Sequence, residues 1–174
     1  GDVYKRQNIQ HAFLMTTLAW LFISLFGSLP FMFSTLNLNF TDAYFETMSG
    51  ITTTGSTILI DVERSSKGIL IWRALLQWLG GIGIIVMAIT ILPLLNVGGM
   101  QVFRAESSDN SEKILPRSRE IALAIFKIYF VLTIACASFY FLFGMSVFDS
   151  IAHSMTTIET GGFSNYTNSF CHFD

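Results

Sequence analysis

The stretch DAYFETMSGITTTGS, residues 42–56, decides the fold because a related stretch, DSIAHSMTTIETGGF, follows at residues 149–163. A shift of 107 positions aligns the two without a gap. An internal repeat of this kind indicates that the chain is built from matching structural units. The alignment pairs identical residues at five positions: Asp42 with Asp149, Met48 with Met155, Ile51 with Ile158, Thr53 with Thr160, and Gly55 with Gly162.

The composition is that of a membrane protein. Of the 174 residues, 52% are hydrophobic and 13% are charged, whereas soluble domains carry roughly 25% charged residues. The mean hydropathy of +0.56 points the same way. The net charge of −2 comes without a basic stripe, which argues against a nucleic-acid partner.

Three apolar runs, residues 12–33, 69–95 and 121–143, reach the roughly 20 residues that a helix needs to cross a bilayer. Two mixed segments, residues 41–52 and 147–158, are too short to cross. We expect these two to be re-entrant pore helices, each followed by a Thr/Gly turn. The sequence therefore predicts an all-α membrane protein in which spanning helix, pore helix, filter loop and spanning helix repeat.

The basic residues predict the orientation in the membrane. They gather in the flank at residues 1–11 and in the polar loop at residues 96–120, and none follows Lys127. By the positive-inside rule, we expect the flank and the loop to be cytosolic and both filter loops to face outside. The basic residues of the loop are Arg104, Lys113, Arg117 and Arg119.

The chain divides into two repeats. The first covers residues 12–95, with its filter at 53–56, and the second covers residues 121–174, with its filter at 160–163 and without a closing helix. Residues 1–11 contain no initiating Met and no apolar leader, so we interpret them as a cytosolic flank or an assembly scar. We expect the chain to be part of a longer protein.

The Thr-x-Gly turns after the pore helices suit a cation. A half-helix that enters from outside places its C-terminus, with roughly half a negative charge, near the middle of the membrane. Glycine permits backbone angles that aim successive carbonyls at an ion, and such carbonyls replace the water shell of potassium in channel filters. We expect ion ligands from six residues: Thr53, Thr54 and Gly55, with Thr160, Gly161 and Gly162.

At this point the chain resembles the Trk/Ktr/HKT superfamily of potassium transporters, specifically its TrkH-type membrane subunits. The motifs that carry the resemblance span the chain from about Ala12 to Ser164. They are FETMSGITTTGST (45–57), WRALLQWLGGIGIIVMAITILPLL (72–95), VGGMQVFRAE (97–106) and HSMTTIETGGFS (153–164). The resemblance implies four pore-loop repeats arranged like one tetrameric potassium channel, of which this chain holds the first and most of the second.

The resemblance also implies function and partners. It predicts transmembrane transport of potassium in the inner (plasma) membrane, with no enzymatic reaction and no cofactor apart from the transported ion. The implied partners are the lipid bilayer, the remaining pore repeats, a second copy in a homodimer and a cytosolic nucleotide-binding regulatory subunit. Residues next to the filter would be Thr52, Ser56, Glu159 and Phe163.

Other functions remain open from the residues alone. An ion-coupled secondary transporter of another cation has broken helices, but its repeats are usually inverted, and these two have one orientation. A non-conducting membrane assembly module is a further alternative. An intramembrane enzyme or a metal site has only the i, i+4 pair of Asp149 and His153 in its favour, with no third ligand nearby.

Four further features have a structural interpretation that we favour. Glu159 either strengthens the field at the ion or binds backbone behind the filter, and we expect the second. Arg73 and Lys127 are expected to reach the membrane interface along their alkyl stems. The LGGIG stretch, residues 79–83, is expected to allow close helix packing rather than to form a hinge.

Overall fold

The computed structural model describes residues 2–91 and 114–173, and within these ranges the regular structure is entirely helical. Three stretches are long and apolar enough to cross a membrane: Phe13–Met32, Lys67–Met87 and Glu120–Leu142. The predicted all-α membrane fold is therefore confirmed. The α-helices are α1 (Asp2–Gly27), α2 (Leu29–Met32), α3 (Phe40–Ile51), α4 (Lys67–Ile91), α6 (Ile114–Leu142) and α7 (Val147–Ile158), with 3-10 turns at Val62–Arg64 and Ser169–Phe173.

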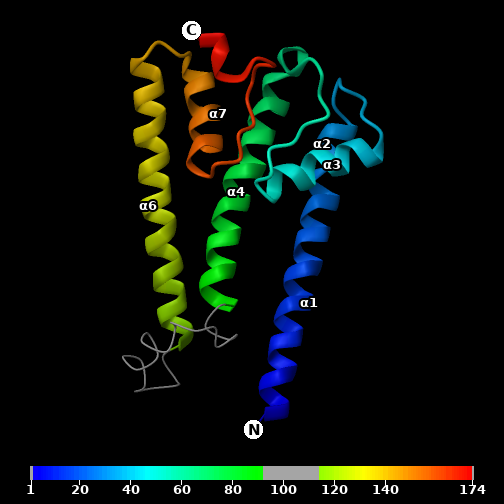
Figure 1. Ribbon diagram of the computed structural model, residues 1–174, viewed down its shortest axis with the longest axis vertical. Coiled ribbons are helices and arrows are strands. Elements are labelled where there is room, and N and C mark those ends of the chain that lie inside the picture. Colours follow the sequence, from blue (N-terminus) through cyan, green and yellow to red (C-terminus); the bar gives the residue numbers. More distant parts are fainter. Residues whose placement is uncertain (1, 92–113, 174) are drawn as a thin grey trace.

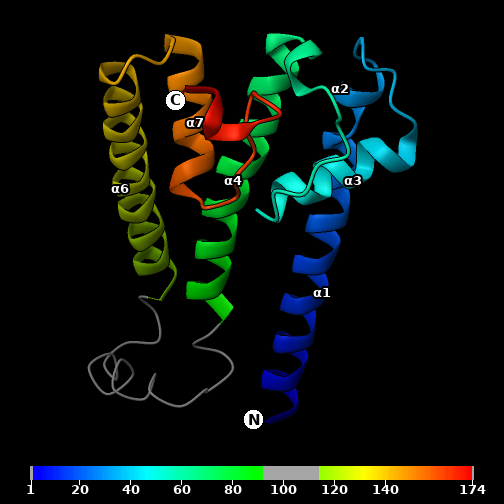
Figure 2. The same ribbon diagram turned by 45° about the horizontal axis from the view of Figure 1, so that its top comes forward.

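The three long helices run side by side, and both half-helices lie at the end opposite the N-terminus (Figures 1 and 2). Helix α4 contacts both half-helices, whereas α1 packs on α3 and α6 packs on α7. In α4, 44% of the most apolar window is buried, against 17% in the first span and 11% in α6. Helix α4 is thus the central element, and the outer faces of the other two are left for lipid.

Two helices begin earlier than the sequence predicts. Helix α1 begins at Asp2 rather than residue 12, and α6 begins at Ile114 rather than residue 121. Hydropathy marks only the apolar part of a helix, and a polar extension continues until something breaks it. Pro116 does not break α6, because the first turn needs no N–H donor from it. Residues 96–113 of the predicted loop lie outside the described residues.

The first span is not one helix. Helix α1 ends at Gly27, and the four-residue helix α2 follows with Pro30 in its first turn. A Cβ on Gly27 would lie 2.7 Å from Cγ2 of Thr47. The glycine therefore lets the end of α1 approach α3 closely, and the break redirects the chain toward the start of the half-helix.

Both half-helices begin with the same kind of cap. The side chain of Asn39 accepts a hydrogen bond from the Asp42 amide at 2.9 Å, and Ser146 Oγ accepts one from the Asp149 amide at 3.1 Å. Asn39 and Ser146 are again 107 positions apart. Each aspartate lies in the first helical turn, where a carboxylate complements the positive end of the dipole.

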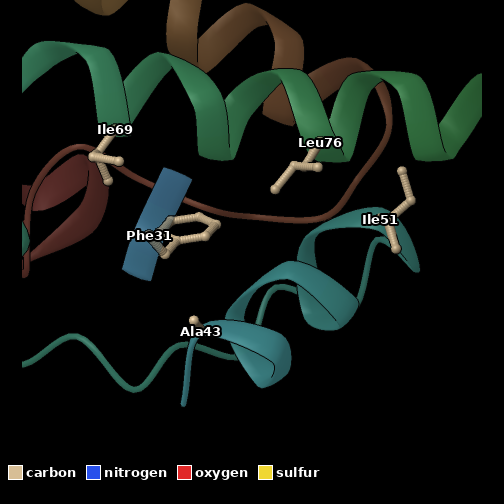
Figure 3. Close-up of a cluster of buried hydrophobic side chains, with 5 residues drawn as sticks. All are labelled: Phe31, Ala43, Ile51, Ile69 and Leu76. Carbon is tan, nitrogen blue, oxygen red and sulfur yellow. The ribbon is translucent and has the colours of Figure 1, made fainter. Parts of the chain in front are cut away.

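A small hydrophobic cluster holds the first half-helix against α4. It consists of Phe31, Ala43, Ile51, Ile69 and Leu76, all at most 5% exposed (Figure 3). Close to it, a Cβ on Gly80 would lie 2.7 Å from the carbonyl carbon of Ile51. Gly80 therefore serves close packing, as expected, and it sets the end of α3 directly on α4.

Candidate filter loops at the ends of the half-helices

Helix α3 ends in a Schellman motif. The Thr53 amide donates to the Gly50 carbonyl and the Thr54 amide donates to the Ser49 carbonyl, both at 2.9 Å. These are the two bonds that define this helix end, and the residue between helix and loop takes a left-handed backbone. Here that residue is Thr53, with φ of 57°. The position usually belongs to glycine.

Helix α7 ends in the same way. The Thr160 amide donates to the Thr157 carbonyl at 3.1 Å, and the Gly161 amide donates to the Thr156 carbonyl at 3.2 Å. Thr160 has φ of 62°. A β-branched residue in this region is a genuine outlier, which costs about 1–2 kcal/mol. Two such residues at matching positions point to a functional requirement on the backbone.

The glycine that follows completes the match. Gly55 has φ of 77° and Gly162 has φ of 80°. Gly162, rather than Gly161, is therefore the conformational equivalent of Gly55, in line with the alignment of the repeats. A Cβ on Gly55 would overlap the carbonyl oxygen of Gly161, whereas a Cβ on Gly162 would meet nothing within 4 Å. The two loops are thus in backbone contact, and Gly162 faces open space.

The carbonyl oxygens of the two loops are available as ligands. The last helical carbonyls, such as those of Ser49 and Thr156, accept the amides of the Schellman bonds. Among the hydrogen bonds of residues 2–91 and 114–173, none reaches the carbonyl oxygens of residues 53–55 or 160–162, whereas carbonyls further along, those of Ser56 and Ser164, accept from Ser49 and Arg73. The residues with available carbonyl oxygens are Thr53, Thr54 and Gly55 in the first loop and Thr160, Gly161 and Gly162 in the second.

The dipoles of the two half-helices favour a cation at their C-terminal ends. Neither half-helix has a basic residue in its last turn, and each has an aspartate in its first turn. The two C-terminal ends come together beside α4 (Figures 1 and 2). Each end contributes roughly half a negative charge. The converging ends therefore make a negative region at the two loops.

A buried ion pair fixes the chain that leaves the first loop. Arg73 Nε lies 2.8 Å from Oε1 of Glu46, and the two side chains are 2% and 0% exposed. The same carboxylate accepts hydrogen bonds from the Thr57 hydroxyl at 2.9 Å and from the Ile58 amide at 3.1 Å. Glu46 therefore holds the segment directly after Ser56 against α3.

Arg73 also reaches the second loop. Its Nη1 donates to the Ser164 carbonyl at 3.0 Å, and its guanidinium carbon lies 4.1 Å from the centre of the Phe163 ring. The expectation that Arg73 extends to the membrane interface is wrong. The side chain turns inward because Glu46 and two loops offer it acceptors that lipid lacks. Lys127, in contrast, is exposed.

The second loop has its own polar anchors. Asp149 accepts hydrogen bonds from Asn165 Nδ2 at 2.8 Å and from the Tyr166 hydroxyl at 3.1 Å. Burial opposes ionisation of Asp149, but these bonds and the one from Ser146 outweigh it, so its pKa lies below the ordinary value. His153, 1% exposed, places Nδ1 2.9 Å from the Asp149 carbonyl and Nε2 3.0 Å from Ser164 Oγ.

His153 is thus a packed residue, and burial lowers the pKa of its imidazole. Its ring also stacks on the ring of Tyr166, with the centroids 6.3 Å apart. Among the described residues, no three His, Cys, Asp or Glu side chains are placed to hold a metal ion. The residues that the i, i+4 spacing singles out therefore serve to support the loop.

Of the four residues expected beside the filter, Thr52 and Glu159 bond to the candidate loops, whereas Ser56 and Phe163 bond to Ser49 and Gln77. The Thr52 hydroxyl lies 2.9 Å from that of Thr54, and the Ser56 carbonyl accepts from Ser49 Oγ at 2.6 Å. The Phe163 amide donates to Gln77 Oε1 at 3.2 Å. Oε1 of Glu159 accepts from the Gly161 amide at 3.1 Å, so the carboxylate binds backbone, as expected. Burial raises the pKa of Glu159 to about 7, against the opposing effect of that amide.

A pocket of about 150 Å³ lies beside the two loops. Its lining includes Gly55, Gly162, Arg73 and Tyr166. Besides Arg73, a second residue connects the two repeats. Glu63 accepts hydrogen bonds from the Thr167 amide at 2.7 Å and from the Thr167 hydroxyl at 2.8 Å. The Thr167 amide is the main cause of a lowered pKa at Glu63. The connections after the two candidate loops are therefore joined to each other.

Sequence reasoning alone misses Glu46 and Gln77 and misreads Arg73. The repeat contains a signal for Glu46, because the shift of 107 places Glu46 on His153 and Thr57 on Ser164. Each pair joins a half-helix to the segment after its filter. Gln77 carries no such signal, since it is one polar residue in an apolar helix.

Comparison with known proteins matches the chain to one family. Residues 3–174 match the family TrkH, described as a cation transport protein. The chain is 52% identical to the Trk system potassium uptake protein TrkI of Halomonas elongata, over 91% of this chain and 32% of that protein. It is 46% identical to the Trk system potassium uptake protein TrkH of Escherichia coli, over 100% of this chain and 36% of that protein.

A solved structure resembles the fold. The crystal structure of the potassium transporter TrkH from Vibrio parahaemolyticus aligns with a TM-score of 0.77 and 44% identity. The alignment covers 89% of this chain and 30% of that one. The chain thus spans about a third of the length of the relatives that it matches.

Proposed function

The chain belongs to the TrkH family of cation transport proteins, and on that premise we propose that it supplies two filter loops of a potassium-conducting pore. In this proposal the ion moves down its electrochemical gradient, and the protein performs no covalent chemistry. The ligands are the backbone carbonyls of Thr53, Thr54 and Gly55 and of Thr160, Gly161 and Gly162.

One observation carries the proposal: Thr53 and Thr160 share a left-handed backbone, and a left-handed glycine follows each of them two residues later. A helix end alone does not need this pattern, because glycine would serve better at the first position. A filter does need it, since alternating backbone conformations expose several consecutive carbonyls. The threonines also add hydroxyl oxygens beside the carbonyls.

The energetics favour this use of the loops. A bare cation in a medium of low dielectric constant would cost tens of kcal/mol by Born solvation, so oxygen dipoles must replace its water. Carbonyls supply these dipoles without a full charge that would hold the ion too tightly. The negative ends of α3 and α7 add a favourable field. Each half-helix has 12 residues and is therefore about 18 Å long, which suits entry halfway into a bilayer of roughly 30 Å.

The same proposal implies a location in the membrane and a set of partners. Two loops would contribute half of a fourfold ion path, and further repeats would contribute the other half. The protein would lie in the inner (plasma) membrane with residues 96–120 in the cytosol and the filters facing outward. The names of the relatives place them in a Trk system. A cytosolic nucleotide-binding regulatory subunit and a homodimeric partner remain proposals.

Uptake of rubidium or potassium into proteoliposomes tests the proposed function. The protein would be a complete subunit of the family that carries this sequence. We expect uptake along the gradient, competition by potassium and weak competition by sodium. Uptake no faster than in empty liposomes, or equal competition by sodium, would contradict the proposal.

A further inference from the structure

Three buried side chains behind the second loop have polar atoms without a hydrogen-bond partner among the described residues. The atoms are Oε2 of Glu159, Nε2 of Gln77 and the hydroxyl oxygen of Tyr129. These residues are 8%, 0% and 6% exposed. Unpaired buried polar atoms are rare because each loses its water without compensation. Three of them on neighbouring elements require an explanation.

Two glycines show that Glu159 lies close to both of the other side chains. A Cβ on Gly81 would lie 2.7 Å from the Tyr129 hydroxyl oxygen and 2.7 Å from Cβ of Glu159. A Cβ on Gly161 would lie 2.5 Å from Gln77 Nε2 and would also meet Oε1 of Glu159. Glu159 thus stands between the other two residues. Because neither glycine carries a side chain, the three polar side chains can lie this close to the backbone and to one another.

The chemistry of the three atoms selects the ligand. Gln77 Oε1 accepts the Phe163 amide, so its Nε2 has N–H donors left to give. Oε1 of Glu159 accepts the Gly161 amide, which leaves Oε2 as an acceptor. A cation would be repelled by the N–H donors. A water molecule can accept from Gln77, donate to Glu159 and pair with the Tyr129 hydroxyl in either sense, and buried waters typically make about three such bonds.

We propose that a buried water molecule binds between Glu159 Oε2, Gln77 Nε2 and the Tyr129 hydroxyl, and that this hydrated site holds the second filter loop in its ion-selective shape. The water fixes two side chains whose other oxygens bind the amides on either side of Gly162. Glu159, Gln77 and Tyr129 are therefore positioning residues. The effect on selectivity rests on the proposed function, whereas the water site itself does not.

The site also makes the two loops different. Thr52 occupies the position of Glu159 in the first repeat. Its hydroxyl donates to the Met48 carbonyl at 2.7 Å, within its own helix. The first loop is instead held through the segment that follows it, because Glu46 binds the Ile58 amide and is paired with Arg73. The second loop would therefore depend more than the first on support from behind.

A high-resolution structure of a complete subunit that carries this sequence tests the water site directly. We expect density for one water within hydrogen-bond distance of the three atoms, and its loss in Tyr129→Phe. Direct pairing of the three side chains with no density between them would overturn the proposal. This result is independent of transport, so it remains decisive even if the wild-type protein conducts no potassium.

Ion preference tests the positioning role. We expect Tyr129→Phe to lower the preference for potassium over sodium about fivefold, the effect of losing one hydrogen bond. Ser138→Ala is the matched control on α6, because the Ser138 hydroxyl donates to the Ile134 carbonyl of the same helix, and we expect no change. Glu159→Gln, which keeps an oxygen for the Gly161 amide, is a second variant with the same expected direction. Wild-type preference in both variants would overturn the positioning role.

Discussion

Glu46 and His153 occupy equivalent positions of the two half-helices, and each binds the hydroxyl side chain that lies eleven residues further along the chain. Glu46 accepts a hydrogen bond from Thr57 at 2.9 Å, and His153 Nε2 lies 3.0 Å from Ser164 Oγ. Arg73 adds a connection between the repeats, since it binds both Glu46 and the Ser164 carbonyl. The segments that leave the two loops are therefore held as one unit.

Removal of Arg73 should destabilise the fold strongly. Arg73→Ala leaves the charge of Glu46 buried without a partner, which typically costs about 3–5 kcal/mol. The unfolding free energy in detergent, followed by circular dichroism, measures the loss. Arg64→Ala is the control, because its pair with Asp61 is exposed and should contribute less than about 1 kcal/mol. Equal effects of the two variants would show that the buried pair does not hold the loops.

The two left-handed glycines should respond differently to alanine. Both variants incur the cost of a left-handed backbone, about 1–2 kcal/mol. Gly55→Ala in addition drives a Cβ into the Gly161 carbonyl, whereas Gly162→Ala finds open space. We expect the unfolding free energy to fall much more for Gly55→Ala. A larger loss of unfolding free energy for Gly162→Ala would show that the loops do not touch at Gly55.

Relief of the strained threonine should separate stability from selectivity. Thr160→Gly removes a β-branched residue from a left-handed backbone, so we expect unchanged stability or a gain of up to about 1 kcal/mol. The preference for potassium over sodium should fall, because the loop loses its hydroxyl and gains freedom. Thermal unfolding and competition uptake measure the two effects. A clear loss of stability would mean that Thr160 is not strained.

Asp149 should contribute a pH-dependent part of stability. Its pKa in the folded protein lies below the ordinary value of 3.8, so above that value the folded state gains from the ionised carboxylate. This contribution is lost as the pH falls through the lowered pKa, since the unfolded state then binds more protons. We expect Asp149→Asn to lower stability at neutral pH and to flatten the acid limb of the unfolding curve.

The partner of Asp149 offers an internal check. Asn165→Ala removes one of the hydrogen bonds that hold the carboxylate ionised. We therefore expect the Asn165→Ala variant to unfold in acid at a higher pH than the wild type does. An unshifted transition would mean that another group controls the acid limb.

Much of the fold could be predicted because each element leaves a local pattern. Apolar runs gave three spans, and the repeat gave two short helices with Thr-x-Gly ends. Helix α3 and helix α7 begin and end within one residue of the predicted bounds. The starts of α1 and α6 could not be predicted in this way, because a helix continues into water where hydropathy gives no signal.

The site could be predicted only in its backbone part. The loops follow from residue type, since glycine and threonine at fixed spacing constrain the chain. The role of Arg73 depends on acceptors at Glu46 and Ser164, which are 27 and 91 positions away in sequence. A charge in a span looks the same in sequence whether it turns toward lipid or toward a partner. Only the packing of α3 on α4 decides between the two.

The most direct test compares Gly162→Ser with Gly144→Ser in potassium uptake by proteoliposomes, with sodium as competitor. Both glycines have a left-handed backbone, with φ of 80° and 101°, and both have open space around a new Cβ. Only Gly162 lies in a proposed filter loop. We predict that Gly162→Ser loses uptake or its preference for potassium, while Gly144→Ser keeps both. Normal uptake and preference in Gly162→Ser would contradict the assignment of the second loop to the ion path.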